Sequence, residues 1–311
     1  MFWPSNYFLE NLLQCVCLLV SKRWLRLLCS STVALALAFI GTPHAIPSLS
    51  SFLSHHPYLS SLSLTDSSSS SSSSFSHHLL QSLASSCPNL RHLRFLAELV
   101  SGFSLLSLSN SCPHLSSLPI SLSRPLCFQW IAPLRPLKDL SVFITGSETE
   151  LFSYNGFAPV LDAKLNLLSF PFLMLNSIYS LSLCGTQGVD YGLNFLWRNC
   201  KKLEKLKLKS CEFVGDNVSF SAFIKGLETL KEVEEVELRT SRTLADGVLL
   251  KLAGGSVSLS SLLVYDGSSK EGLLQFISHS RADVQKLDLR LPLDLDNDHL
   301  IAVAENFENG S

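Results

Sequence analysis

The sequence predicts an α/β solenoid in which short parallel strands line a concave face and helices cover the convex face. One short motif, with apolar residues at its first, fourth and sixth positions, recurs along most of the 311 residues. A polar residue usually separates the fourth and sixth positions, as expected for a strand that buries one face. Amphipathic helical segments follow many of the motifs. One such unit cannot close a core, so the units must stack on copies of themselves.

The clearest copy of the motif lies within residues 200–216, which read CKKLEKLKLKSCEFVGD. Its apolar positions are Leu203, Leu206 and Leu208. Strand alternation turns the intervening residues outward, namely Lys205, Lys207 and Lys209. With Cys200 before the first leucine and Cys211 after the last, the spacing resembles the leucine-rich repeat in its cysteine-containing form.

Copies of this motif cover most of the chain. Their first apolar residues are Leu59, Leu90, Leu115, Leu137, Ile178, Leu203, Val233, Leu259 and Val284. The spacing clusters near the repeat length of this architecture, except for a longer interval from Leu137 to Ile178. A weaker unit around Leu165 and Leu167 is a candidate to fill that interval. We therefore expect a solenoid of about nine or ten repeats over residues 31–311.

Residues 1–30 carry a helical pattern that differs from the repeats. Apolar residues recur at helical spacing at Leu9, Leu12, Leu13, Val16 and Leu19. The stretch 19–27 reads LVSKRWLRL and, with Trp24 after two basic residues, resembles the second half of an F-box. An F-box usually begins with a Leu-Pro pair, and residues 1–7 offer only Pro4. We expect residues 1–30 to form a partial F-box-like helical segment.

The apolar run 27–40 follows three basic residues, a layout that also occurs in signal peptides. The run is shorter than the roughly 20 residues that span a bilayer. Its larger apolar residues alternate with smaller ones, at Val33, Leu35, Leu37 and Phe39. This period predicts a first strand that seals the solenoid, with a signal segment as the alternative.

The segments between the motifs are uneven in composition. We expect a short helix at 46–56 and a flexible loop at the polyserine tract 67–74. Prolines crowd the region from Leu115 to Leu137 and, because they cannot donate to a ladder, predict the most irregular part of the stack. These are Pro119, Pro125, Pro133 and Pro136. Residues 148–172 lack a clear unit and are expected to form a longer loop.

Convex-side helices are expected after the later motifs because amphipathic segments follow them at similar distances. They span 190–197, 218–226, 245–253, 270–278 and 298–307. The sequence ends one helix after the last motif, so we expect an apolar final edge, covered by a partner or by further chain.

Charge and cysteine content narrow the class of protein. A net charge of -2 and a pI near 6.5 argue against a dedicated nucleic-acid binder. The nine cysteines are odd in number, and Cys87, Cys112, Cys200 and Cys211 occupy repeat-defined positions. Buried thiols of this kind require the reduced state, which predicts a cytoplasmic or nuclear protein with no membrane anchor.

Catalytic and metal-binding motifs are missing from the sequence. It contains no GxSxG, GxxxxGK[ST], HExxH or CxxC pattern. The nearest approach to a metal cluster consists of His55, His56, His77, His78 and Cys87, which lack ligand spacing. We expect a protein that is not an enzyme and that needs no cofactor or metal.

The concave face is the remaining candidate site, because equivalent positions of stacked strands become neighbours about 5 Å apart. The first outward row contains Lys205, Glu235, Ser261 and Lys286, and the second contains Lys207, Glu237, Leu263 and Asp288. These rows predict ladders of solvated ion pairs. The third row contains Lys209, Arg239, Tyr265 and Arg290, with no acid in line. It predicts a basic rim around an aromatic residue that grips an acidic partner segment.

Taken together, the F-box-like segment and the repeats resemble the plant-type F-box leucine-rich-repeat proteins. The resemblance implies a substrate-recognition subunit of a Skp-cullin-F-box ubiquitin ligase. The F-box residues, Leu9, Leu12, Leu13, Val16, Leu19 and Trp24, would contact a Skp-type adaptor on a cullin scaffold, and the solenoid would hold a protein target. Two alternatives stay open: a repeat module without ligase assembly, and a membrane-tethered or secreted repeat protein.

Overall fold

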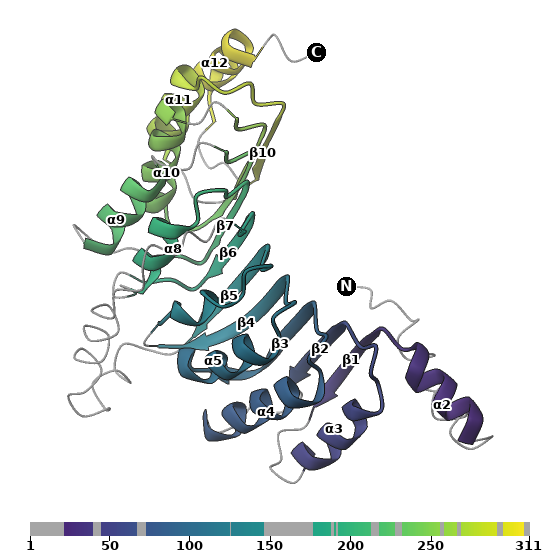
Figure 1. Ribbon diagram of the computed structural model, residues 1–311. Coiled ribbons are helices and arrows are strands. Elements are labelled where there is room, and N and C mark those ends of the chain that lie inside the picture. The colour runs from purple at the N-terminus through teal and green to yellow at the C-terminus, as the bar shows by residue number, and fades with distance from the viewer. Residues whose placement is uncertain are drawn as a thin grey trace.

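The computed structural model describes residues 22–39, 45–66, 73–124, 126–145, 177–187, 190, 192–212, 218–227, 232–255, 258–265, 269–290 and 295–307. In these residues the chain forms one curved, ten-stranded parallel sheet with helices along its outer side (Figure 1). The strands follow one another in sequence order, and each pairs with the next. The predicted leucine-rich-repeat solenoid is confirmed.

Nearly every strand begins two residues after the first apolar position of its motif, as the repeat pattern requires. The strands are β1 (Ala34–Phe39), β2 (Ser61–Asp66), β3 (His92–Val100), β4 (Ser117–Ser123), β5 (Asp139–Thr145), β6 (Ser180–Cys184), β7 (Lys205–Lys209), β8 (Glu235–Arg239), β9 (Ser261–Tyr265) and β10 (Lys286–Arg290). The register matches equivalent repeat positions: Leu206 lies opposite Leu181 on one side and Val236 on the other.

Helices form the convex layer. They are α3 (Ala45–Ser54), α4 (Ser73–Ser86), α5 (Gly102–Ser111), the 3-10 helix η1 (Gln129–Ile131), α8 (Leu193–Asn199), α9 (Val218–Leu227), α10 (Arg242–Gly255), α11 (Lys270–His279) and α12 (Asn297–Phe307). Consecutive helices pack on one another from α3 to η1 and again from α8 to α12. Each predicted convex helix is present, with ends shifted by a few residues.

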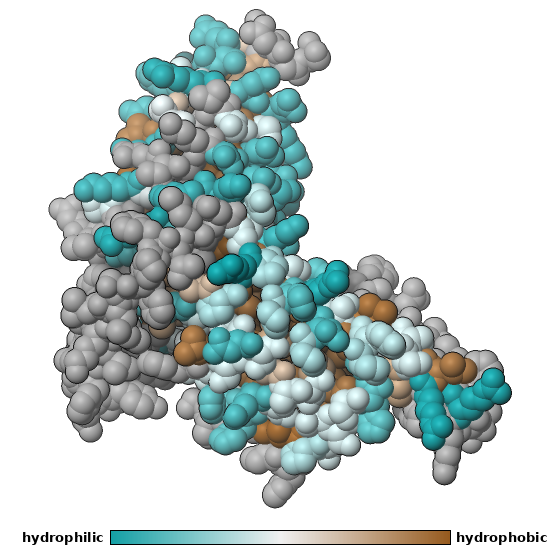
Figure 2. Space-filling view, viewed as in Figure 1, coloured by the Kyte–Doolittle hydropathy of each residue, from teal (hydrophilic) through white to brown (hydrophobic). Residues whose placement is uncertain are grey.

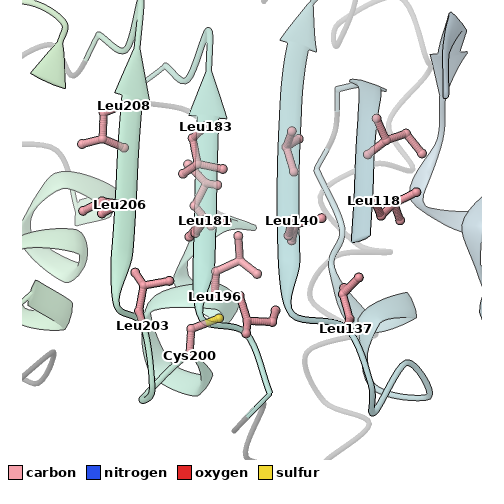
Figure 3. Close-up of a cluster of buried hydrophobic side chains, with 14 of the residues drawn as sticks. Leu118, Leu137, Leu140, Leu181, Leu183, Leu196, Cys200, Leu203, Leu206 and Leu208 are labelled. Carbon is pink, nitrogen blue, oxygen red and sulfur yellow. The ribbon is translucent and has the colours of Figure 1, made fainter. Parts of the chain in front are cut away.

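The core is a set of leucine rows between the sheet and the helices. Figure 3 shows inward side chains of neighbouring strands lined up in this way, among them Leu118, Leu140, Leu181 and Leu206. All four are at most 1% exposed. Full burial of such a side chain stabilises the fold by about 1.5–3 kcal/mol, so many stacked repeats together produce a stable core.

The proline-rich region from Leu115 to Leu137 is irregular on one side of β4 and in the convex layer, but its β4–β5 ladder is intact. Strands β4 and β5 pair continuously over seven positions, including Pro119 opposite Ser141. The register shifts between β3 and β4, after Phe95. After β4, the proline-rich segment forms only the short η1 in place of a full helix. Its Trp130 is buried and donates from Nε1 to the Cys127 carbonyl.

Strands β5 and β6, on either side of the long interval between motifs, pair directly, from Asp139 opposite Ser180 onward. The weak unit around Leu165 and Leu167 lies within residues 146–176, outside the described chain. Strand β1 has no repeat motif of its own, and it is the strand that the alternation at residues 33–39 predicts.

A buried ion pair joins the two segments that flank this interval. Arg124, just after β4, directs Nε toward Asp190 Oδ1 at 2.8 Å, and both side chains are at most 4% exposed. A second guanidinium nitrogen donates to Asp190 Oδ2 at 3.0 Å and to the Gly185 carbonyl at 2.9 Å. Asp190 Oδ2 also accepts from the backbone N–H of Gln187 at 2.7 Å. We name this contact the seam pair.

The polyserine tract and its histidines also differ from expectation. Ser73 and Ser74, the last residues of the tract, begin helix α4, and residues 67–72 lie outside the described chain. His77 and His78 lie within that helix. His56, two residues after the end of α3, is buried, with Nδ1 2.9 Å from the Phe52 carbonyl oxygen. No group of metal-ligating side chains occurs in the part of the chain that the structure describes.

At the N-terminal end of the stack, helix α2 (Lys22–Ser31) precedes β1 and projects beyond it (Figure 1). The apolar run 27–40 is thus divided between the end of a helix and an edge strand. Among the described residues, no helix has both the length and the hydrophobicity to cross a membrane. At the opposite end, the inward residues of β10 are half-buried, and α12 exposes Leu300 and Ile301 by 64% and 55%.

Candidate target-binding surface on the concave face

The outward side chains of β7 to β10 form the charged part of the concave face. Alternation along each strand exposes every second residue, and the parallel register aligns these residues in three rows across the strands. In Figure 2 hydrophilic residues gather over these C-terminal repeats. We name this surface the charged half.

The first two rows contain the predicted ion pairs. Lys205 Nζ is 2.9 Å from a Glu235 carboxylate oxygen, with both side chains more than 40% exposed. In the second row Lys207 Nζ is 3.1 Å from Glu237 Oε2. The Glu235 hydrogen bond and charge raise the pKa of Lys205. Exposed ion pairs of this kind contribute little to the free energy of unfolding. Their main effect is to orient the lysine and glutamate side chains.

The third row brings its aromatic and basic residues together as predicted. Arg239 places its guanidinium carbon 5.4 Å from the centroid of the Tyr265 ring, within range of a cation–π contact. Arg290 lies opposite Tyr265 on the adjacent strand, and Lys209 lies opposite Arg239. The third row is therefore one continuous surface across four strands.

The third row itself contains no acid, as the sequence indicates, but acids of the second row pair with its cations. Arg239 Nε lies 2.6 Å from Glu237 Oε1, and Lys209 Nζ lies 3.9 Å from the same atom. Arg290 is paired in the same way, because its guanidinium lies 2.8 Å from an Asp288 carboxylate oxygen. The physical reason is the strand period: residues two apart share a face, so a second-row acid reaches a third-row cation.

Glu237 is a shared counter-ion that lies below the cations. Its side chain is 13% exposed, whereas Lys207, Lys209 and Arg239 are each about 40% exposed. Burial on its own raises the pKa of Glu237, but the Lys207 hydrogen bond and the charges of the three cations outweigh it, so the pKa is lowered. A partner approaching the concave face therefore meets the cations first.

Cations outnumber acids on this surface even after pairing. The cations at outward positions are Lys205, Lys207, Lys209, Arg239, Lys286 and Arg290. The acids are Glu235, Glu237 and Asp288. Lys286 has no ion pair with any residue that the structure describes. With six cations and three acids, the surface keeps a positive excess of three charges.

The adaptor-contact residues are placed only in part. Trp24 lies in α2, and Leu9, Leu12, Leu13, Val16 and Leu19 lie outside the described residues. Within α2, Arg23, Arg26 and Leu27 are exposed. Sequence reasoning did not assign Glu237 or Asp288 to the basic rim, although the spacings Glu237–Arg239 and Asp288–Arg290 carried the signal.

The repeat-defined cysteines are buried thiols, as predicted. Cys112 Sγ is 3.5 Å from the Cys87 carbonyl oxygen, and Cys211 Sγ is 3.3 Å from that of Lys209. Burial raises the pKa of Cys87 and Cys112 to about 11 and that of Cys200 to about 12. Every cysteine in the described part of the chain is a free thiol.

Comparison with known proteins finds only distant similarity, and it is to solved structures. Searches of protein-family profiles and of curated proteins returned no match. Among solved structures, the chain is similar to one from the crystal structure of the Rad7 and Elc1 complex in yeast, with 15% identity and a TM-score of 0.46, over 98% of this chain and 75% of that one. It is also similar to an internalin (inlF) from Listeria monocytogenes, with 13% identity and a TM-score of 0.30, over 90% and 87% of the two chains. At these scores the neighbours bear on neither partner nor activity.

Proposed function

We propose that this protein is the target-binding subunit of a Skp-cullin-F-box ubiquitin ligase. Its solenoid holds a protein target, and an F-box-like segment at residues 1–30 binds a Skp-type adaptor that links it to a cullin. The observation that carries the proposal is the LVSKRWLRL segment at 19–27, joined directly to the repeats. Fold alone does not specify a function, so this segment supplies the assignment to a ligase.

The position of α2 supports a division of labour. This helix lies at the end of the stack, ahead of β1, while the charged half lies on the later repeats (Figure 1). An adaptor bound near α2 would leave the concave face open to a target. Ubiquitin transfer would take place on other subunits, and this chain would supply proximity without a reactive side chain.

The charged half is the proposed target site. Its positive excess and the Arg239–Tyr265 contact favour an acidic segment of a partner protein. Aromatic and arginine side chains dominate the energetics of many interfaces, which makes these two residues the expected anchors.

Adaptor binding tests the ligase assignment. The full-length chain and a version lacking residues 1–30 would each be co-expressed with a Skp-type adaptor and purified. We expect a stoichiometric adaptor with the full chain and none with the shortened one. If the full chain carries no adaptor, the ligase role is excluded.

A repeat module without ligase assembly is the second candidate. It is supported by the charged half, which can hold a target without an adaptor. In that case the chain would bind its target through the charged half and recruit no cullin.

We propose a cytoplasmic or nuclear location because the buried thiols suit a reducing compartment. Titration of thiols in denaturant, without reductant, tests this point. All nine cysteines should react, and disulfide-linked cysteines would favour the secreted alternative.

A further inference from the structure

The residues that immediately precede the strands form a continuous row along one edge of the sheet. From Ser60 onward, each backbone N–H of this row donates to the carbonyl oxygen of the equivalent residue in the preceding repeat, at 2.7–2.9 Å. Neighbouring members therefore lie one strand spacing, about 4.8 Å, apart. We name it the strand-start row, and its members in order are Val33, Ser60, Arg91, Ser116, Lys138, Tyr179, Glu204, Glu234, Ser260 and Gln285.

Charge is sorted by sign about the middle of the strand-start row. Two cations, Arg91 and Lys138, precede Tyr179, and both are exposed. Two acids, Glu204 and Glu234, follow it, the first partly exposed and the second exposed. None of these four side chains forms an ion pair with a residue that the structure describes. The row thus offers two positive charges on one side of a partly exposed tyrosine and two negative charges on the other.

The charges beside the row leave this order unchanged. On the basic side, the exposed Arg135 adds a positive charge and the exposed Asp139 a negative one. On the acidic side, the exposed Glu232 adds a negative charge and the exposed Lys202 a positive one. Lys205, the first residue of β7, is engaged by its own ion pair in the first outward row. The residues of the strand-start row therefore set the sign of each side.

A row that is basic on one side of its centre and acidic on the other is complementary to itself after a half-turn. A two-fold axis through Tyr179 places Lys138 opposite Glu204 of a second copy. The same axis brings Arg91 within one strand spacing of Glu234 of that copy, which a long side chain can reach. Each contact occurs twice. When the axis follows the radius of the curved stack, both rows keep the same curvature and stay in contact along their length (Figure 1).

We propose that the strand-start row is a self-association surface through which two copies of this chain pair with two-fold symmetry. The two Tyr179 side chains meet at the centre, and the complementary charges around them set the register. The contact lies at the start of the strands, whereas Lys209 of the third row is five residues further along β7, roughly 16 Å away. Pairing therefore leaves the proposed target surface open, and it does not depend on the proposed ligase role.

Charge exchange between two variants of the full-length chain tests the proposal by sedimentation equilibrium. The first variant carries Arg91→Glu and Lys138→Glu, which makes both sides of its row acidic. The second carries Glu204→Lys and Glu234→Lys, which makes both sides basic. We expect wild type to form a dimer and each variant alone to self-associate about tenfold or more weakly, because like charges then face each other. An equimolar mixture of the two variants should form a heterodimer, since every facing pair is again of opposite sign.

A matched control changes the same kinds of charge elsewhere. Lys225→Glu with Glu305→Lys alters exposed side chains of α9 and α12 and should dimerise like wild type. Recovery in the mixture also shows that the two variants are folded, because a misfolded chain cannot restore the contact. A wild-type protein that stays monomeric at every concentration, or a mass beyond the dimer that grows with concentration, would overturn the proposal. So would variants that dimerise like wild type, or a mixture that fails to associate.

Discussion

The early and late repeats bury the same residue type and expose different ones. Leu62 and Leu64 in β2, like Leu206 and Leu208 in β7, are at most 1% exposed. Outward positions of β2, β4 and β6 carry no charged side chain and are mostly serine, namely Ser61, Ser63, Ser117, Ser121, Ser123, Ser180 and Ser182. The outward positions of β7 to β10 form the charged half. In Figure 2 paler residues of intermediate hydropathy lie over the early repeats.

Inward and outward positions of the repeats are therefore under different constraints on residue type. Inward positions must fill the space between the sheet and the helices, so every repeat has a similar apolar residue there. Outward positions meet no such demand and are free to differ. The change from serine to charge at β7 is the reason for proposing the target site on the charged half.

We expect the largest loss of stability when the seam pair, which lies between the early and the late repeats, is broken. Asp190→Asn removes the negative charge that two guanidinium nitrogens of Arg124 contact at a buried site, which should cost about 3–5 kcal/mol of unfolding free energy. Urea denaturation measures this loss. Asp139→Asn, at an exposed position of β5, is the control and should stay within about 0.5 kcal/mol of wild type. A wild-type midpoint for Asp190→Asn would mean that the pair does not join the parts.

The shared core predicts equal sensitivity of early and late repeats. Leu64→Ala and Leu208→Ala each remove a fully buried side chain, so each should cost about 2–5 kcal/mol in the same denaturation assay. If one substitution is tolerated and the other is not, the two parts do not share one type of core.

The charged half should govern target binding while the serine-rich repeats should not. We expect Arg239→Glu combined with Arg290→Glu to weaken binding of a co-purified target at least tenfold, because both cations flank Tyr265. Arg94→Glu reverses an exposed arginine on β3 and should leave the affinity unchanged. Circular dichroism of all variants checks that the fold is intact, and equal affinities would remove the basic surface from the account.

The smallest expected effect is a loss of stability at acidic pH that arises from Glu237 in the charged half. The cations around Glu237 lower its pKa in the folded state, so its contribution to stability is complete above its unfolded pKa and is lost as pH falls through the folded pKa. Glu237→Gln should therefore show a shallower loss of stability between about pH 6 and about pH 3 than wild type. Thermal melts across this range measure the slope, and parallel curves would show that the cluster is not coupled to folding.

The fold was predictable because the leucine spacing is a local pattern that repeats many times. The same spacing in each copy supports the interpretation of the others. The helix of 73–86 was missed because serine dominates its sequence, although Leu79, Leu80 and Leu83 face the core. Row-by-row comparison placed Tyr265 among cations but overlooked Glu237, which belongs to a neighbouring row. The seam pair joins residues that are 66 positions apart in sequence, and no local pattern predicts it.

The central claim, that the late concave face holds the target, is tested most directly by placing one photoreactive phenylalanine analogue at a time on two aromatic positions. Tyr265 lies in the charged half, and Phe143 lies outward on β5 among the early repeats. After irradiation in cell extract, we predict a crosslinked protein from position 265 that disappears when Arg239 and Arg290 are changed to glutamate, and none from position 143. A crosslink from position 143 alone, or one at 265 that survives both charge reversals, would contradict the account.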